Sequence, residues 1–549
     1  MISWRTGPLV PVVLFLFCCA LYAINLDKAP HFDELYHVLA ARGYLATGDF
    51  AIAEGVYNRA RPFTWLVAQL FALLGDHLWV ARLPSLVSTA LLATVLFVWL
   101  RREAGSLAAI IGAGLFAVSP FAVDIAEFAR FYGIHGLAFG VAALLVYDLL
   151  TRELTPRSLL LRGLGAILGF LVAIMFQVTT FIGIAGLAAW AVLYLCAPWF
   201  LREDVPPVRR LGVLAAVLAV GLVLAVVALG SDQLAGALSQ YRKTPLWSEG
   251  NANDVAYYHV WLILYYPTLW TLLPVLFLVG LAVRARACFF AAVLFGTAII
   301  LHSFAGAKDL RYIFYAMPFL FVIWGIALAA VLAQLVRFVR IQADTVLARL
   351  LPERPVGGLV TVAVAVCALW LVAANAASVR SALMLADITI PPERPAPRWE
   401  EARPILEPLM AEADVVVVTS ELEALYFLGT YDVLISRSRM GEGAAASRGG
   451  VNEEFFRDPR TGRPVISTPE SVERLMACHQ RGIIITSNYR WRHAPMLSNE
   501  VADLIVQHTA PVELPPRSQV MAFTWDRPTG ATTEPCPDLD RQTASPPTS

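Results

Sequence analysis

The chain has 549 residues and no net charge, and 58% of it is hydrophobic while only 15% is charged. Soluble globular chains are far more polar than this, so lipid must be the main solvent for much of the protein. The balanced charge also argues against a nucleic-acid partner. The composition therefore predicts a polytopic α-helical membrane protein.

Long apolar runs, separated by short polar breaks, recur along most of the chain. A helix needs roughly 20 apolar residues to cross a bilayer. We predict about eleven such spans, which lie near residues 8–26, 80–100, 105–122, 133–150, 163–176, 179–197, 211–230, 260–283, 287–305, 312–336 and 356–377. The shorter apolar stretch from Arg61 to Leu74 is expected to lie on the outer surface as an interfacial helix.

Arginines cluster in alternate breaks, and basic residues mark the cytoplasmic side of a membrane. These arginines are Arg5, Arg101, Arg102, Arg152, Arg157, Arg162, Arg202, Arg209, Arg210, Arg284, Arg286, Arg337, Arg340, Arg349 and Arg354. The pattern places the N-terminus in the cytoplasm and everything after about residue 378 outside. The outward loops are then 27–79, 123–132, 231–259 and 306–311. Lysine is confined to Lys28, Lys243 and Lys308, a bias typical of GC-rich bacterial genomes, so we expect a bacterial inner (plasma) membrane.

From Pro391 onward the sequence turns polar, and short β-type runs alternate with helical segments. We predict an extracytoplasmic α/β domain over 391–527, with strands at 414–420, 431–436 and 483–487 and helices at 469–481 and 497–508. It contains no glycine fingerprint for a dinucleotide or phosphate, so no cofactor is expected. Residues 528–549 read as a disordered tail. Cys478 and Cys536 could form a disulfide in an oxidising compartment or stay apart, since Cys536 lies in that tail.

Two adjacent carboxylates, Asp33 and Glu34, lie near the start of the first outward loop. An acid at the outer membrane boundary can accept a proton from a hydroxyl while a lipid-linked donor lies beside it. A simpler alternative is that Asp33 caps the helix predicted to run toward Gly48. A metal site built from His31, Asp33, Glu34 and His37 is not favoured, because no helix face brings together histidines six residues apart.

Charged residues also occur in the other outward loops. If helical, the second loop places Asp124, Glu127 and Arg130 on one face, where a surface ion pair is the alternative to a functional group. Arg61, Lys308 and Arg311 could hold a phosphodiester. Anchoring to lipid headgroups is the alternative for these three residues.

Four local segments occur in a recognisable order. They are Phe32–Glu34, then Arg61–Trp65 with Ala81–Ser85, then Ser119–Pro120 with Glu127–Tyr132, and finally Arg311–Tyr312 with Pro318. Together they resemble the family 39 type of membrane glycosyltransferase. This family has the GT-C fold and includes protein O-mannosyltransferases and the lipid A aminoarabinose transferase. Arg61 departs from the lysine common there, and the C-terminal domain has no match that we can name.

The resemblance implies an inverting glycosyltransferase that moves a sugar from a polyprenyl-phosphate donor to a glycan, lipid or protein acceptor on the outer face. Asp33 would be the catalytic base, with Glu34 in support. Donor phosphate recognition would fall to Arg61, Arg130, Lys308 and Arg311, while Glu127, Tyr132 and Tyr312 would support the site. A divalent metal is possible there but is not favoured.

Two other classes of protein fit the span count. A lipid-linked sugar transporter or flippase is one, but coupled transport usually needs ionisable groups within spans, and the predicted spans hold essentially none at mid-membrane. A scaffold or sensor that works through the C-terminal domain is the other. It would make the acids of the membrane domain dispensable.

Overall fold

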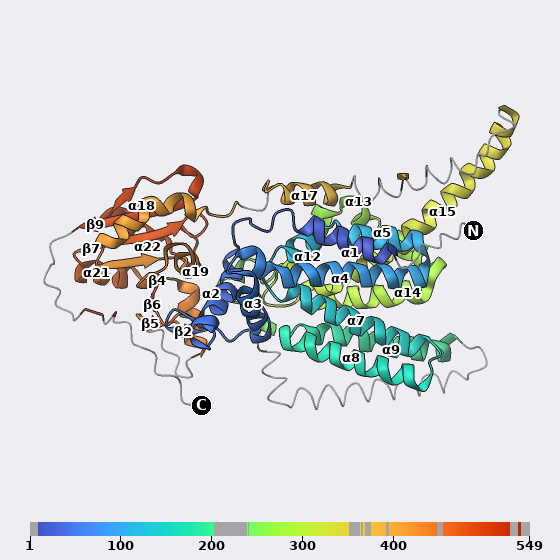
Figure 1. The fold of residues 1–549 in the computed structure, drawn as a ribbon, viewed down its shortest axis with the longest axis horizontal. Coiled ribbons are helices and arrows are strands. Elements are labelled where there is room, and N and C mark those ends of the chain that lie inside the picture. Colours follow the sequence, from blue (N-terminus) through green and yellow to red (C-terminus); the bar gives the residue numbers. More distant parts are fainter. Residues whose placement is uncertain are drawn as a thin grey trace.

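The computed structural model of the chain describes residues 9–201, 241–350, 375–390, 395–446 and 454–526, together with isolated positions such as Cys536. It has two parts, a body of long helices and a C-terminal domain built on a β-sheet (Figure 1). The segment after the first helix lies between them. Its elements are α2 (Phe32–Thr47), β1 (Ala51–Ile52), β2 (Gly55–Val56) and α3 (Arg61–Leu74).

The helical body has a core of α1, α4, α5, α7, α14 and α15, whose buried side chains form one large hydrophobic cluster. The bounds of its elements are α1 (Leu9–Tyr22), α4 (Leu78–Ala104), α5 (Ser106–Ala117), α6 (Pro120–Ala126), α7 (Tyr132–Thr151), α8 (Pro156–Phe176), α9 (Thr180–Leu201), η1 (Leu246–Asn251), α12 (Tyr257–Tyr265), α13 (Pro267–Thr271), α14 (Leu273–Ser303), η2 (Leu310–Ala316), α15 (Met317–Leu350) and α17 (Ala376–Leu385).

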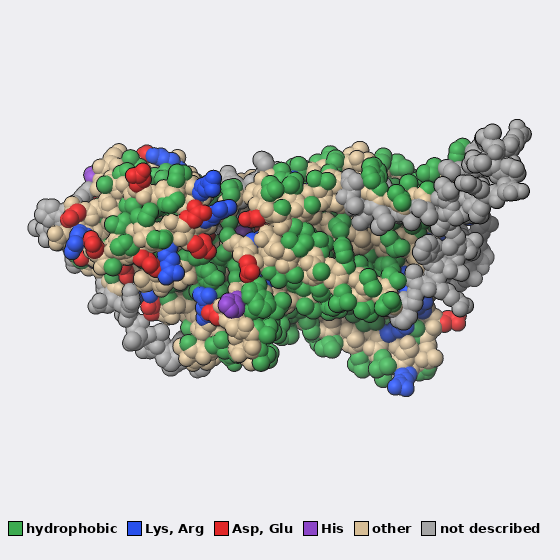
Figure 2. Space-filling view, turned by 45° about the horizontal axis from the view of Figure 1, so that its top comes forward, with side chains coloured by type: hydrophobic (Ala, Val, Ile, Leu, Met, Phe, Trp, Pro, Cys, Tyr) green, Lys and Arg blue, Asp and Glu red, His purple; other side chains and the backbone are tan. Residues whose placement is uncertain are grey.

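Within the described residues, five helices are long and apolar enough to cross a membrane, or six if the bent pair α5 and α6 counts as one span. The expected spans at 80–100, 133–150, 163–176 and 312–336 fall on α4, α7, α8 and α15. The span expected at 211–230 lies outside the described residues, and so does most of the span expected at 356–377. Figure 2 shows the helical body as mostly hydrophobic on the face in view, with charged side chains gathered toward its ends and over the C-terminal domain.

Helix α14 reverses direction within its own bounds. Arg284 has non-helical backbone angles (φ −142°, ψ 64°). The Cys288 sulfur lies 3.7 Å from the carbonyl oxygen of Phe277, and a Cβ on Gly280 would come within 2.6 Å of the same sulfur. Eight residues of straight helix would separate Gly280 from Cys288 by about 12 Å. The chain therefore turns back at Arg284, at the break predicted between the spans 260–283 and 287–305.

Two of the predicted basic breaks, the one after α4 and the one after α7, meet at one end of the helical body. Asp148, at the end of α7, forms ion pairs with Arg102 (2.5 Å), Arg152 (3.0 Å) and Arg162. Arg102 is near the C-terminus of α4. Since α4 has 27 residues, its other end lies about 40 Å away. These two basic breaks and the start of α4 are thus at opposite ends of the body.

The C-terminal domain contains a seven-stranded sheet in the order β5-β6-β4-β3-β7-β9-β8. Its parallel centre is β6, β4, β3 and β7, while β5, β9 and β8 are added antiparallel. The strands are β3 (Val415–Val418), β4 (Val433–Ile435), β5 (Phe456–Arg457), β6 (Pro464–Ile466), β7 (Arg481–Ser487), β8 (Ala510–Val512) and β9 (Val520–Asp526). The helices are α18 (Trp399–Glu412), α19 (Glu421–Glu423), η3 (Ala424–Leu428), α20 (Arg437–Ala446), α21 (Pro469–Cys478), η4 (Pro516–Ser518) and α22 (Asn499–His508).

Helices cover both faces of this sheet. Val416 and Val418 of β3 pack with α18, whereas Val415 and Val417 pack with α21 and α22. A strand buried on both faces is apolar throughout, which explains why the run DVVVVTS was recognisable. The predicted strands and helices of this domain are confirmed, with slightly different ends.

Helix α18 is not among the predicted elements, and it contains Pro404 and Pro408, residues that disfavour a helix interior. Both prolines are exposed, on the side of the helix away from Trp399, Ala402 and Leu406, which are buried against the sheet. The apolar face therefore holds the helix in place despite the two lost backbone donors.

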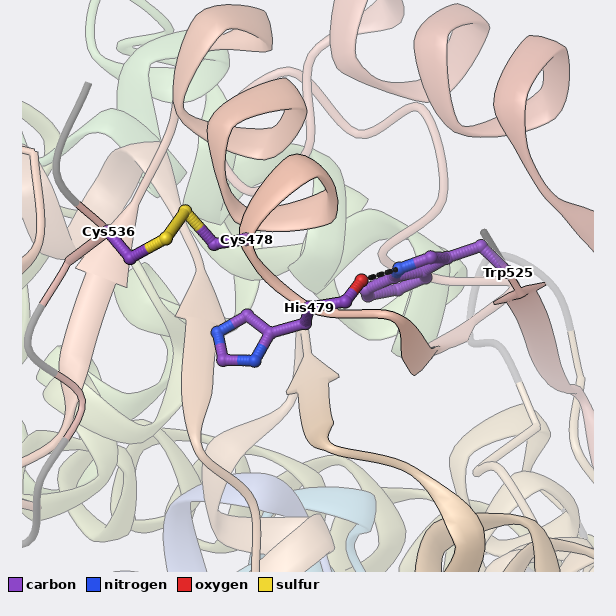
Figure 3. Close-up of a disulfide and its surroundings, with 4 residues drawn as sticks. All are labelled: Cys478, His479, Trp525 and Cys536. Atoms are coloured by element: carbon purple, nitrogen blue, oxygen red, sulfur yellow. Dashed lines mark hydrogen bonds between the residues drawn. A yellow bond between two sulfur atoms is a disulfide. The ribbon is translucent and has the colours of Figure 1, made fainter. Parts of the chain in front are cut away.

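The two cysteines of the polar region are paired. Cys478 ends α21 and is joined to Cys536, with a Cα–Cα distance of 5.6 Å. In Figure 3 the bond lies beside His479, whose carbonyl accepts a hydrogen bond from the indole N–H of Trp525 at 3.0 Å. The disulfide attaches Cys536 to the domain. Most of the tail predicted over 528–549 lies outside the described residues.

Candidate active site

The first turn of α2 presents Asp33 without using it as a helix cap. His31 is the N-cap: its Nδ1 accepts from the backbone N–H of Asp33 at 3.1 Å, and the Glu34 carboxylate accepts from the backbone N–H of His31 at 2.8 Å. The capping role considered for Asp33 is therefore wrong. Its side chain keeps 22% of its surface exposed.

A guanidinium from a distant loop meets the Asp33 carboxylate. Arg311 Nη1 lies 2.6 Å from Asp33 Oδ2, and its Nη2 lies 3.2 Å from Asp309 Oδ2. Asp309 also caps η2, because its side chain accepts from the backbone N–H of Arg311 at 3.1 Å. Arg311 thus holds two carboxylates in a fixed arrangement.

Three aromatic rings surround this guanidinium. The Arg311 Cζ atom lies 5.7 Å from the ring centre of Phe128, 5.9 Å from that of Tyr132 and 5.8 Å from that of Tyr312. Cation–π attraction at these distances restrains the arginine. The predicted supporting residues Tyr132 and Tyr312 therefore act on Arg311, and through it on Asp33.

The surroundings of Asp33 keep it ionised. Burial by itself raises the pKa of the Asp33 carboxyl, but Arg311, followed by Arg130, His31 and Arg59, lowers it, and the balance leaves the pKa well below its ordinary value. An opposite charge this close favours the ionised form. Asp33 is therefore a carboxylate, able to accept a proton, throughout the physiological pH range.

The pKa of Asp33 should depend on Arg311 in a measurable way. In Arg311→Gln the nearest positive charge is gone while burial remains, so the pKa of Asp33 should rise, by about one to three units. The folded-state pKa is depressed, so the ionised form is lost only when pH falls through it. The acid limb of kcat should accordingly move to higher pH in the variant. An unchanged acid limb would show that Arg311 does not control Asp33.

Glu34 has a different task from its neighbour. Its carboxylate accepts from Arg82 Nε at 2.8 Å and Nη2 at 2.7 Å, and also from the backbone N–H groups of Ala129 and His31 at 2.7 and 2.8 Å. Both Glu34 and Arg82 are fully buried. Four hydrogen bonds occupy the carboxylate, so it cannot also take a proton from a substrate. Glu34 ties α2 to α4 and to the loop after α6.

Arg130, in the loop between α6 and α7, reaches the site from the other side. Its Nη1 donates to the backbone carbonyl of Asp33 at 2.9 Å and to the hydroxyl of Tyr57 at 3.2 Å. It is buried, yet no carboxylate in the described part of the chain pairs with it, and its Nε has no partner. Its charge is available to an anion.

The basic residue of the hairpin that approaches Asp33 is Arg59 rather than Arg61. Arg59 Nη2 donates to Gln177 at 3.4 Å, its guanidinium lies over Phe131, and it is among the charges that lower the pKa of Asp33. Arg61 instead donates from Nε to Asn58 Oδ1 at 3.1 Å and lies exposed at the start of α3. Both arginines are exposed, but Arg59 and not Arg61 is among the charges that act on Asp33. The structure therefore gives no support to Arg61 as a phosphate ligand, because the sequence pattern identifies the segment and not which of its arginines lies near Asp33.

Lys308 is occupied by backbone groups. Its ammonium donates to the carbonyls of Asn251 (2.9 Å), Ala252 (2.6 Å) and Ala305 (2.9 Å). These three bonds use all three of its N–H donors. Lys308 therefore fastens the loop at η1 to the end of α14, and the phosphate contact expected from its sequence position is not supported.

Glu127 does not share a helix face with Arg130, because α6 ends at Ala126 and Glu127 is its C-cap. The buried carboxylate instead lies 2.5 Å from Lys28 Nζ, whose side chain keeps 22% of its surface exposed, so the pair is partly buried and joins two loops. Burial raises the pKa of Glu127, and Lys28 opposes that rise. The surface ion pair expected within the loop is thus replaced by a partly buried pair between loops.

Several buried polar atoms near Asp33 have no hydrogen-bond partner. They are His37 Nε2, Glu127 Oε1, Arg130 Nε and Arg311 Nε. Buried polar groups are nearly always paired in folded proteins, so such a cluster marks a place where a polar ligand or water completes the bonding.

No three potential metal ligands gather in the part of the chain that the structure describes. In particular, Glu34 is held by Arg82, and His37 is held by Thr64 at 2.8 Å.

The fold and the site define a multi-pass membrane protein with an acidic and arginine-rich site at one end of its helical body, beneath a sheet domain. Neither a family model nor a curated protein sequence matches the chain.

Solved structures do match. Over 94% of this chain and 98% of the other, it is similar to ArnT from Cupriavidus metallidurans bound to undecaprenyl phosphate, with 16% identity and a TM-score of 0.57. The apo state of that protein has a TM-score of 0.55 at 16% identity, over 93% and 97% of the two chains. The Archaeoglobus fulgidus oligosaccharyltransferase tethered with an acceptor peptide has 11% identity and a TM-score of 0.52, over 95% and 74%. The GT-C fold expected from the resemblance is confirmed.

Proposed function

We propose that this protein is an inverting glycosyltransferase that uses a polyprenyl-phosphate-linked sugar as donor. One observation carries the proposal: Asp33 is held as a carboxylate by Arg311, next to two arginines, Arg59 and Arg130, that pair with no carboxylate in the described part of the chain. A base beside surplus positive charge is what transfer from a phosphodiester requires. The GT-C fold, shared with a structure that binds undecaprenyl phosphate, supports the choice of carrier.

The chemistry follows from these groups. A carboxylate oxygen of Asp33 takes the proton of an acceptor hydroxyl as its oxygen attacks the anomeric carbon. The bond between that carbon and the phosphate oxygen breaks on the opposite face, so the configuration inverts. The leaving polyprenyl phosphate gains one negative charge, which Arg59 and Arg130 are placed to stabilise.

The acceptor belongs to one of three chemical classes, a glycan, a lipid or a protein side chain, and the sugar is a hexose or a pentose. We place the reaction on the outer face of a bacterial inner membrane, with the N-terminus in the cytoplasm and the C-terminal domain outside. Mass spectrometry of surface glycans, lipids and proteins from cells with and without the gene tests the proposal. A single sugar missing from one acceptor is expected. If only the sidedness of an intact lipid-linked sugar changed, a flippase would replace the transferase.

The two arginines at the hairpin give a matched test of donor recognition. Arg59→Ala should weaken binding of undecaprenyl phosphate to the detergent-solubilised protein by about tenfold or more, since one charge-assisted contact to phosphate contributes roughly 1.5–3 kcal/mol. Arg61→Ala removes the same charge two residues away, from a side chain held by Asn58, and should leave binding within about twofold. Equal losses in the two variants would assign the effect to general surface charge.

A further inference from the structure

The C-terminal domain and the first outward loop share a hydrophobic cluster. Leu422, from α19, is fully buried against Leu35 and Tyr36 of α2 and against Ile52 and Tyr57 of the hairpin. A cluster that draws on both parts resists their separation. In Figure 1 the ends of β5 and β6 lie against β2 on the same side of the molecule.

The turn between β5 and β6, Asp458–Gly462, also contacts the hairpin. Its carbonyls at Thr461 and Pro459 accept from the backbone N–H groups of Glu54 and Val56, each at 3.1 Å. Arg463, just after the turn, forms an ion pair with the Glu54 carboxylate. Backbone pairing of this kind fixes the turn relative to the hairpin.

Two glycines make the approach possible. A Cβ on Gly55 would lie 2.4 Å from the carbonyl carbon of Arg460, and a Cβ on Gly462 would lie 2.7 Å from the carbonyl carbon of Glu54. Neither position can accept a side chain without moving backbone. Gly462 also has φ +72°, a conformation that other residues adopt only with strain.

This turn brings Arg460 to the aromatic pair beside the active site. Its Nη1 donates to the Tyr36 hydroxyl at 3.2 Å, and its guanidinium lies 5.6 Å from the centre of the Tyr36 ring. The Tyr36 ring stacks on that of Tyr57, with centroids 4.8 Å apart and planes within 12°. The Tyr57 hydroxyl accepts from Arg130 Nη1, the same nitrogen that donates to the carbonyl of Asp33.

We propose that Arg460, supplied by the C-terminal domain, is a positioning residue for the transfer reaction: through Tyr36 and Tyr57 it fixes Arg130 and the first turn of α2. The inference rests on the function proposed above. It gives the C-terminal domain a defined role, because the site is incomplete without the Asp458–Gly462 turn. Misplacement of reacting groups by about 1 Å can lower a rate roughly a hundredfold, so a residue outside direct contact can matter this much.

The test compares kinetics in the full-length protein. Arg460→Ala should lower kcat by about tenfold or more while the KM for the lipid-linked donor stays within about twofold, since Arg59 and Arg130 remain. Arg403→Ala, on the exposed face of α18, is the control and should change neither kcat nor KM.

A second variant tests the route through Tyr36, because Tyr36→Phe removes only the hydroxyl. If Arg460 acts through the Tyr36 hydroxyl, the double variant Arg460→Ala/Tyr36→Phe should be no slower than Arg460→Ala alone. Additive losses, or an unchanged kcat in Arg460→Ala, would overturn the proposal.

A second measurement does not depend on activity. Hydrogen–deuterium exchange in the peptide containing Phe32–Tyr36 should speed up in Arg460→Ala and in Gly55→Ala, which displaces the turn, but not in Gly296→Ala, where a Cβ meets open space. If the wild-type protein transferred no sugar, the proposed function would fail while the exchange result still decided whether Arg460 positions α2. Unchanged exchange in both variants would remove the positioning role even in an active enzyme.

Discussion

Asp33→Asn should abolish sugar transfer while leaving the protein folded and able to bind undecaprenyl phosphate. The amide keeps the size of the side chain but cannot take a proton from the acceptor, and a positioned base contributes about 10²–10⁴-fold to a rate. Arg311 retains Asp309 as a partner, and Glu34 still fixes the first turn of α2. Turnover should be measured with purified protein and a lipid-linked donor, with product followed by mass spectrometry.

The matched control for this variant is Asp309→Asn. It removes a carboxylate from the same guanidinium, but asparagine still caps η2 and Asp33 still faces the site. Its loss of kcat should be far smaller than that of Asp33→Asn. Near wild-type turnover in Asp33→Asn would end the proposal that Asp33 is the base, and comparable losses in both variants would point to the Arg311 network as a whole.

Glu34→Gln should lower the stability of the protein more than any surface substitution does. The change leaves the buried guanidinium of Arg82 without its counter-charge, and breaking a buried pair in this way costs about 3–5 kcal/mol. The pKa of Glu34 is also lowered, because Arg82 and the backbone N–H groups of Ala129 and His31 outweigh the effect of burial. This stabilisation is present above the ordinary glutamate pKa and is lost as pH falls toward the folded-state value. The thermal unfolding midpoint in detergent measures the effect.

Glu407→Gln provides the comparison, because it removes one partner of an exposed ion pair with Arg403 on α18. Exposed pairs contribute about 0–1 kcal/mol, so its unfolding midpoint should barely move. If the unfolding midpoint of Glu34→Gln matched that of Glu407→Gln while its transfer activity was lost as completely as in Asp33→Asn, the Glu34 carboxylate would take part in the reaction and not only stabilise the fold.

Sequence patterns located the site at the level of segments. Phe32–Glu34, Glu127–Tyr132 and Arg311–Tyr312 come from three loops that the sequence predicts to lie outside, and the structure brings all three together around Asp33. Such segments can be recognised because their spacing relative to apolar spans is a local property. The division of labour within each segment was not predictable, since it depends on partners far away along the chain. Glu34, for example, is engaged by Arg82, 48 residues later.

By itself the sequence determined that lipid solvates most of this chain, where its long apolar helices lie, and that a polar α/β domain follows them. Hydrophobic burial and strand or helix periodicity are summed over neighbouring residues, so they can be read without a fold. Only the tertiary structure decided that Asp33 rather than Glu34 is available as a base, that Arg59 rather than Arg61 is close enough to act on its charge, and that Lys308 fastens two loops together. It alone placed Arg460 beside Tyr36. These outcomes depend on distances of a few ångströms between segments up to 424 residues apart, over which charge and hydrogen-bond geometry change completely.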